Sequence, residues 1–99
     1  MVRAIHQTPE LAEVCRRNRI ARLAVFGSVA TGSERADSDI DLLVDFDADA
    51  EIGMVAFGGA MLDLEAYFGR KVDLVTRNGL HPRLRDQILA QAEVIFAAR

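Results

Sequence analysis

The stretch Asp39-Ile40-Asp41-Leu42-Leu43-Val44 sets the architecture of this chain, because it combines the apolar run of a buried strand with two carboxylates at alternate positions. Successive side chains leave a strand on opposite faces. One face of this strand is wholly apolar and suited to a core: Ile40, Leu42, Val44 and Phe46. Asp39 and Asp41 share the other face, where like charges repel each other and lose solvation when covered. A cation bound between them would remove that cost.

A second short run, Lys71-Val72-Asp73-Leu74-Val75, carries a third carboxylate. Its valine at position 72 and its leucine point to one face, and Asp73 points to the other. If this run pairs beside the first strand with both apolar faces inward, Asp73 joins Asp39 and Asp41. Three carboxylates can hold two divalent ions about 3.5 to 4 Å apart, and their hard oxygens favour Mg²⁺ or Mn²⁺ over zinc. The predicted chemistry is in-line displacement at a phosphate.

Gly27-Ser28 supplies a phosphate-binding turn. The pair follows an apolar run over residues 23–26, which predicts a strand, and precedes a short helix predicted over residues 28–32. Glycine lets backbone approach a phosphate closely, and the free N–H groups at a helix start attract anions. Ser28 can cap that helix and bond a phosphate oxygen. We expect both residues to contact a nucleotide.

The remaining pattern predicts alternating helices and strands. Helices are expected over about residues 9–18 and 53–68 and from residue 82 onward, and strands over about residues 21–26, 39–45, 71–75 and 94–96. Apolar stripes predict which helical residues face inward: Leu11, Val14 and Cys15, then Met54, Phe57, Met61, Leu64 and Phe68, then Leu84, Ile88 and Leu89. We expect a single α/β (α+β) domain over residues 1–99, a small mixed β-sheet with helices packed on one face and the carboxylate face left open.

Composition and the lack of long apolar runs limit the partners and the class of protein that we expect. The chain has 99 residues, 12 basic and 15 acidic, so its net charge of −3 argues against direct nucleic-acid binding, which needs a cationic surface. Cys15 is the only cysteine, so no internal disulfide can form. No apolar run has the length of a membrane span or of a signal peptide. The expected location is the cytoplasm.

These motifs resemble the DNA polymerase beta type nucleotidyltransferase superfamily and, more closely, the minimal nucleotidyltransferases, also called MNT proteins or MntA-like antitoxins. The resemblance rests on residues 23–32 and 37–44 together with the later aspartate, and it spans about residues 11–96. It implies a polymerase-beta-like core in which Asp39 and Asp41 ligate two Mg²⁺ ions, with Mn²⁺ as the alternative. Asp73 would complete the site and orient or deprotonate the attacking hydroxyl, while Gly27 and Ser28 would hold ATP.

The sequence departs from the family at one point. Many relatives place an arginine just after the Gly-Ser pair, whereas residues 29–32 here are Val-Ala-Thr-Gly. Arg22 and Arg35 are the candidates to replace it.

The resemblance also implies a partner protein. Family members are encoded beside a HEPN-domain ribonuclease toxin and neutralise it by transferring AMP from ATP to a toxin tyrosine. A chain of 99 residues has no room for an acceptor-holding domain. The expected partner is therefore a HEPN-domain toxin or another small helical protein, in a hetero-oligomer, with a homodimer as a further arrangement.

Two other functions stay open. The protein could be a non-catalytic antitoxin or binding module that masks its partner, with a vestigial metal site. It could also transfer a nucleotidyl group to a small molecule together with a helical partner subunit. The sequence specifies neither the acceptor nor the nucleotide preference.

Overall fold

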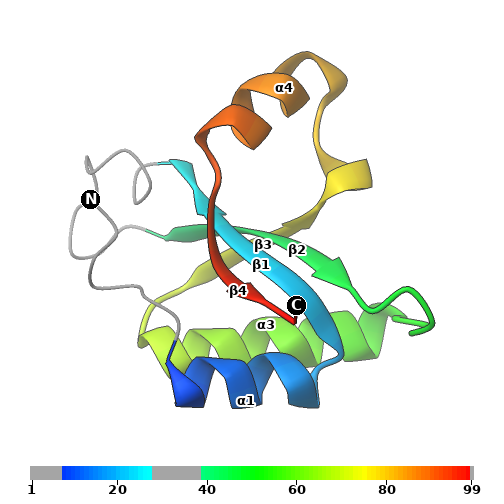
Figure 1. Ribbon diagram of the computed structural model, residues 1–99, viewed down its shortest axis with the longest axis vertical. Helices are drawn as coiled ribbons and strands as arrows, with labels where there is room; N and C mark the ends of the chain where they lie inside the picture. Colours follow the sequence, from blue (N-terminus) through cyan, green and yellow to red (C-terminus); the bar gives the residue numbers. More distant parts are fainter. Residues whose placement is uncertain (1–7, 28–38, 99) are drawn as a thin grey trace.

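The computed structural model describes residues 8–27 and 39–98, which form a four-stranded sheet between helices (Figure 1). The strands are β1 (Ile20–Phe26), β2 (Ile40–Phe46), β3 (Val72–Thr76) and β4 (Glu93–Ala97). The helices are α1 (Pro9–Arg17), α3 (Met54–Phe68) and α4 (Pro82–Gln91), and a 3₁₀ turn, η1 (Arg77–Gly79), follows β3. Each observed boundary lies within one residue of its prediction. The short helix predicted over residues 28–32 lies outside the described residues.

Capping side chains fix the helix ends. The Thr8 side chain accepts a hydrogen bond of 3.0 Å from the Leu11 backbone N–H at the start of α1, where proline occupies the first helical position. Gly69 ends α3 in the left-handed conformation, with φ of +68°, which glycine adopts without steric cost. His81 caps α4, because its Nδ1 accepts a hydrogen bond of 3.1 Å from the Arg83 N–H.

The sheet is mixed, as predicted, with strand order β3-β2-β1-β4. β1 runs antiparallel to both β2 and β4, whereas β3 runs parallel to β2. In this register Asp41 of β2 lies opposite Phe26 on one side and opposite Asp73 on the other. Two predicted carboxylates and the end of β1 therefore meet at the same end of the sheet.

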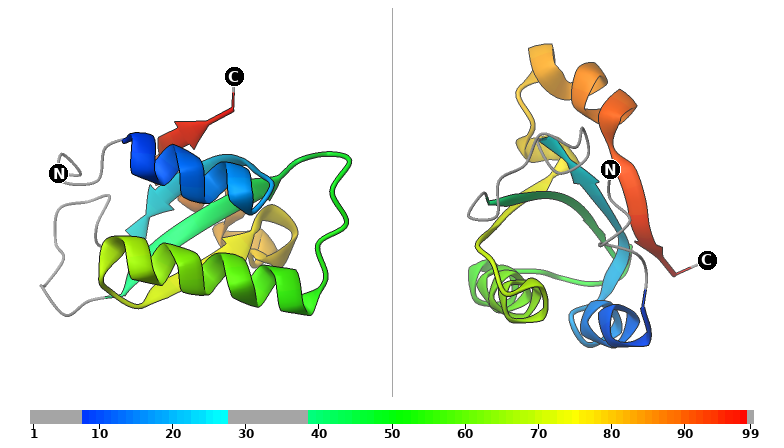
Figure 2. Two further views of the ribbon diagram at one scale, coloured as in Figure 1. Left: turned by 90° about the horizontal axis from the view of Figure 1, so that it is seen from below. Right: turned by 90° about the vertical axis from the view of Figure 1, so that its left-hand side faces the viewer.

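Helices α1 and α3 cover one face of the sheet (Figure 2). The apolar face of β2 lies beneath them, as its alternation predicts, and Leu42 is fully buried there. Cys15 also belongs to this core, where burial raises the pKa of its thiol to about 12 although the nearby Arg16 opposes the shift. Such a thiol is inert, since the reactive form is the thiolate.

Helix α4 corrects the expectation that all helices pack on one face. It lies on the opposite side of the sheet from α1 and α3 (Figure 1), and it covers a small second core. That core is made of four buried residues with partly buried residues of α4 beside them: Ala24, Phe26, Leu43, Leu80, Ile88 and Leu89. The reason lies in β2, where Leu43 sits on the carboxylate face and requires an apolar cover. The carboxylate face is thus only partly open.

Two residues predicted to face inward are exposed instead. Met54 is 92 % exposed and Leu84 is 49 % exposed. With 3.6 residues per turn, Met54 lies about 120° around α3 from the buried Ala60. Leu84 belongs to the first half of α4, whereas the residues of α4 that pack on the second core, Ile88 and Leu89, belong to its second half.

No helix within residues 8–27 and 39–98 combines the length and the apolar character needed to cross a membrane.

Candidate active site

Three carboxylates gather where β2 and β3 begin. Asp39 directly precedes β2, Asp41 is the second residue of that strand, and Asp73 is the second residue of β3. Because β2 and β3 are parallel neighbours, Asp41 and Asp73 are paired across strands that lie roughly 4.8 Å apart. The structure therefore confirms the prediction that these two strands lie side by side.

The electrostatics of this cluster centre on Asp41. Burial raises the pKa of the Asp41 carboxyl above its ordinary value, and the negative charges of Asp73 and Asp39, with a hydrogen bond to Asp73, raise it further. Each of these causes disfavours the ionised carboxylate. A divalent cation among the three groups would reverse that balance, since it favours the ionised form.

Gly27 lies directly against this cluster. It follows Phe26, the cross-strand partner of Asp41, and its backbone has φ of +73°, in the left-handed region. A Cβ added at Gly27 would collide with Oδ2 of Asp41 and lie 3.1 Å from its Cγ. Glycine is therefore required both by the backbone angle and by the close approach of the carboxylate. Ser28, predicted to bind the nucleotide beside it, lies outside the described residues.

The three aspartates suit a hard divalent cation that is also bound by water or by nucleotide oxygens. Within the described residues, no three acidic, histidine or cysteine side chains form a group that could hold a metal ion by themselves. Mg²⁺ is usually bound by one or two carboxylates together with water and substrate phosphates, and seldom in an all-protein cage. An incomplete cluster of aspartates beside a glycine turn is compatible with that mode of binding, in which nucleotide oxygens complete the coordination.

Other charged residues on the same face serve different contacts. Asp45, four residues after Asp41, forms a bidentate ion pair with Arg77, at 2.9 Å from Nε and 3.1 Å from Nη2. The sequence pattern does not predict this pair; the parallel register, which places Val44 beside Thr76, brings the next residues along, Asp45 and Arg77, together. Arg22 lies opposite Asp45 in the sheet and roughly 13 Å along β1 from the carboxylate end. Arg35 lies outside the described residues.

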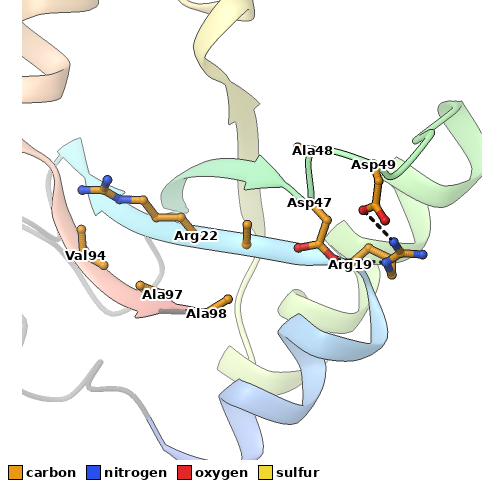
Figure 3. Close-up of a pocket in the computed structure, with 9 residues that line it drawn as sticks. Arg19, Arg22, Asp47, Ala48, Asp49, Val94, Ala97 and Ala98 are labelled. Atoms are coloured by element: carbon orange, nitrogen blue, oxygen red, sulfur yellow. Dashed lines mark hydrogen bonds and ion pairs between the residues drawn. The ribbon is translucent and has the colours of Figure 1, made fainter.

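A broad hollow of about 910 Å³ lies elsewhere, between β1, β4 and the segment after β2 (Figure 3). None of the three clustered aspartates lines it. Arg19, which lines the hollow, forms ion pairs of 3.1 Å with both Asp47 and Asp49, so these three side chains are engaged with one another. The backbone of Arg19 has φ of +60°, which lets the chain turn from α1 into β1. Of the predicted candidates for nucleotide binding, only Arg22 is among the residues that line this hollow.

Comparison with known proteins gives the family. The nucleotidyltransferase domain family matches residues 10–95 of the chain. A protein adenylyltransferase, MntA of Thermococcus cleftensis, is 34% identical over 90 residues, which cover 90% of this chain and 86% of that protein.

Solved structures agree with this assignment. A structure provisionally described as a minimal nucleotidyltransferase has 43% sequence identity and a TM-score of 0.69, covering 82% of this chain and 81% of that one. A toxin–antitoxin crystal structure with AMP-PNP has a TM-score of 0.71 at 22% identity, covering 91% of this chain and 73% of that one, and shows the shared fold. The chain therefore belongs to the nucleotidyltransferase domain family and, within it, to the minimal nucleotidyltransferases.

Proposed function

We propose that the protein transfers AMP from ATP to a hydroxyl group, most naturally a tyrosine, of a partner protein, and that this transfer neutralises a HEPN-domain toxin. The observation that carries the proposal is the cross-strand pairing of Asp41 with Asp73, with Asp39 near enough to raise the pKa of Asp41 and with Gly27 against the Asp41 carboxylate. Nucleotidyl transfer needs acidic ligands for divalent cations next to a turn that can accept a triphosphate.

The chain's own residues have distinct roles in this proposal. Asp39 and Asp41 hold the cation, and Asp73 orients the acceptor hydroxyl and receives its proton. Mg²⁺, when bound, neutralises charge that develops on the phosphate oxygens. The acceptor oxygen forms a bond to the α-phosphorus, the bond from that phosphorus to the bridging oxygen breaks, and pyrophosphate leaves. Gly27, with Ser28, positions the triphosphate for in-line attack.

Two relatives support a protein acceptor. The Thermococcus cleftensis relative carries the name protein adenylyltransferase, and the AMP-PNP structure with the shared fold is a toxin–antitoxin structure.

Transfer of label from α-labelled ATP to a HEPN-domain toxin, with Mg²⁺ present, tests the proposal. We expect labelled toxin with the wild-type protein and a loss of about 10²-fold or more with Asp39→Asn or Asp41→Asn, because each substitution removes a charge that holds the cation. Asp45→Asn is the matched control. It lies on the same strand and the same face, but its carboxylate is paired with Arg77.

The same assay separates the alternatives. Neutralisation of the toxin that persists in Asp39→Asn and Asp41→Asn without any label transfer would overturn the proposal in favour of masking. Label that appears in a small molecule instead of the toxin would assign the other nucleotidyl acceptor. Equal transfer by Asp41→Asn and Asp45→Asn would remove the clustered aspartates from the mechanism.

A further inference from the structure

The solvent-facing side of α3 is apolar, which is unusual for a surface helix. Val55 is 90 % exposed and Leu62 is 62 % exposed, seven residues apart and therefore on the same side of the helix. We call this side the outer face of α3; it consists of Val55, Gly58, Gly59, Leu62 and Ala66. An apolar exposed strip of this kind marks an interaction surface.

The two charged residues of α3, Asp63 and Glu65, lie outside this outer face. Asp63 accepts a hydrogen bond of 2.9 Å from Asn18 and forms an ion pair of 3.4 Å with Arg17 of α1. Glu65 accepts a hydrogen bond of 3.0 Å from the backbone N–H of Val72. Both carboxylates are thus engaged at the two flanks of the helix, where they contact neighbouring elements, and the strip between them carries no charge.

The outer face is self-complementary. Gly58 and Gly59 lie midway between Val55 and Leu62, and a Cβ added at either glycine would meet nothing within 4 Å. Val55 and Leu62 lie at equal distances, three and a half residues, on either side of this glycine pair. When two copies cross in antiparallel orientation about a two-fold axis at the glycines, each Val55 meets the Leu62 of the other copy. The glycines weaken the helix, but they let the two helices approach closely, and the contacts made on close approach offset that cost.

Charges at the two ends of α3 fit the same orientation. Glu51 lies before the helix and Lys71 lies after it, and both are exposed. Neither side chain forms an ion pair within the part of the chain that the structure describes. About a two-fold axis at the glycines, an antiparallel pair places Glu51 of each copy on the same side as Lys71 of the other copy, whereas a parallel pair places like charges side by side.

We propose that the protein forms a homodimer through the outer faces of α3, antiparallel about Gly58 and Gly59. A stable interface buries about 800 Å² on each partner. A helix of 15 residues is about 22 Å long and about 10 Å wide, so it supplies only part of that area. The dimer is therefore reversible and dissociates on dilution.

Analytical ultracentrifugation of the full chain, without nucleotide or toxin, tests the dimer and is independent of catalysis. We expect a concentration-dependent dimer for the wild type and a dissociation constant raised about tenfold or more by Leu62→Glu, because the substitution places a charge in the apolar centre. Leu84→Glu is the matched control, an exposed leucine on α4 that is 49 % accessible, and it leaves the dissociation constant unchanged. Circular dichroism establishes that both variants fold.

Cysteine cross-linking tests the orientation. Mixing Val55→Cys with Leu62→Cys under mild oxidation gives a mixed disulfide in higher yield than either variant alone, and the wild type gives none, because its Cys15 is buried. A wild type that is monomeric at every concentration overturns the proposal. A dimer that survives Leu62→Glu also overturns it, as does a Leu62→Glu defect confined to toxin binding, which would assign the face to the toxin.

Discussion

The two faces of the sheet are covered to very different extents. On one face, α1 and α3 enclose a continuous core of sixteen buried residues that contains no buried polar or charged side chain. On the other face, α4 covers a core of four buried residues, and Asp41 lies at the edge of this core, opposite Phe26 in the sheet. A single strand, β2, contributes to both faces through its alternating side chains.

The face toward α1 and α3 therefore contributes mainly to stability, whereas the opposite face carries the candidate active site. The face toward α1 and α3 can be packed tightly because nothing has to enter it. The opposite face leaves its carboxylates accessible, at the cost of a smaller core and of charge repulsion at Asp41. Substitutions on the two faces should therefore affect different properties of the protein.

The largest difference is expected between adjacent leucines of β2. Leu42 is fully buried under α1 and α3, so Leu42→Ala should lower the free energy of unfolding by about 2–5 kcal/mol. Leu43 is 3 % exposed in the smaller core and borders a hollow of about 240 Å³. Leu43→Ala should cost roughly half as much, since fewer contacts are lost. Urea denaturation of both variants measures the difference, and equal costs would refute the unequal cores.

Gly27→Ala probes the contact between the glycine turn and the carboxylates. A Cβ at this position forces a left-handed alanine and displaces the Asp41 carboxylate, which should cost about 1–3 kcal/mol of stability and reduce AMP transfer more than tenfold. Gly59→Ala, at an open helical position, is the control and should retain transfer. Full activity in Gly27→Ala would show that the close approach has no functional role.

A smaller effect of opposite sign is expected from Asp41→Asn. Because the pKa of Asp41 is raised in the folded protein, its ionised form destabilises folding at neutral pH. Asp41→Asn should therefore raise the melting temperature by a few degrees while AMP transfer is lost. The gain should disappear as the pH falls through 3.8, the ordinary carboxyl value, since both folded and unfolded states are then protonated.

Mg²⁺ provides the check on this prediction. Addition of Mg²⁺ should stabilise the wild type and not Asp41→Asn, because only a ligand bound to the native state raises its stability. A melting temperature that falls in Asp41→Asn at neutral pH, or that responds equally to Mg²⁺ in both proteins, would contradict the assignment of burial and charge repulsion as the causes of the raised pKa of Asp41.

The smallest effect is expected at the ion pair on the same face. Arg77 is 41 % exposed and Asp45 is 31 % exposed, so Arg77→Ala should lower stability by no more than about 1 kcal/mol. Differential scanning calorimetry at low and high salt measures the effect, which should shrink as salt screens the pair. A loss comparable to that of Leu42→Ala would mean that this pair, and not the core, holds the face together.

The sequence predicts strand identity and the apolar face of β2 well, because period-two alternation and glycine or proline at the helix ends are local signals. The prediction that β3 lies beside β2 also holds.

The placement of α4 was not predicted, because its cover over Leu43 depends on contacts between segments far apart in the chain. The exposure of Met54 has a related reason. An apolar stripe predicts burial, whereas exposed positions of α3 are apolar as well. The raised pKa of Asp41 likewise depends on its burial and on the register that places Asp73 beside it, and neither can be read from composition.

Anomalous diffraction from crystals containing Mn²⁺ and a nonhydrolysable ATP analogue would examine the carboxylate cluster without recourse to activity. We predict manganese density among the carboxylates of Asp39, Asp41 and Asp73, with the triphosphate adjacent to Gly27. Manganese density at another place, or three carboxylates that point apart with no metal between them, would contradict the assignment of this end of the sheet as the active site.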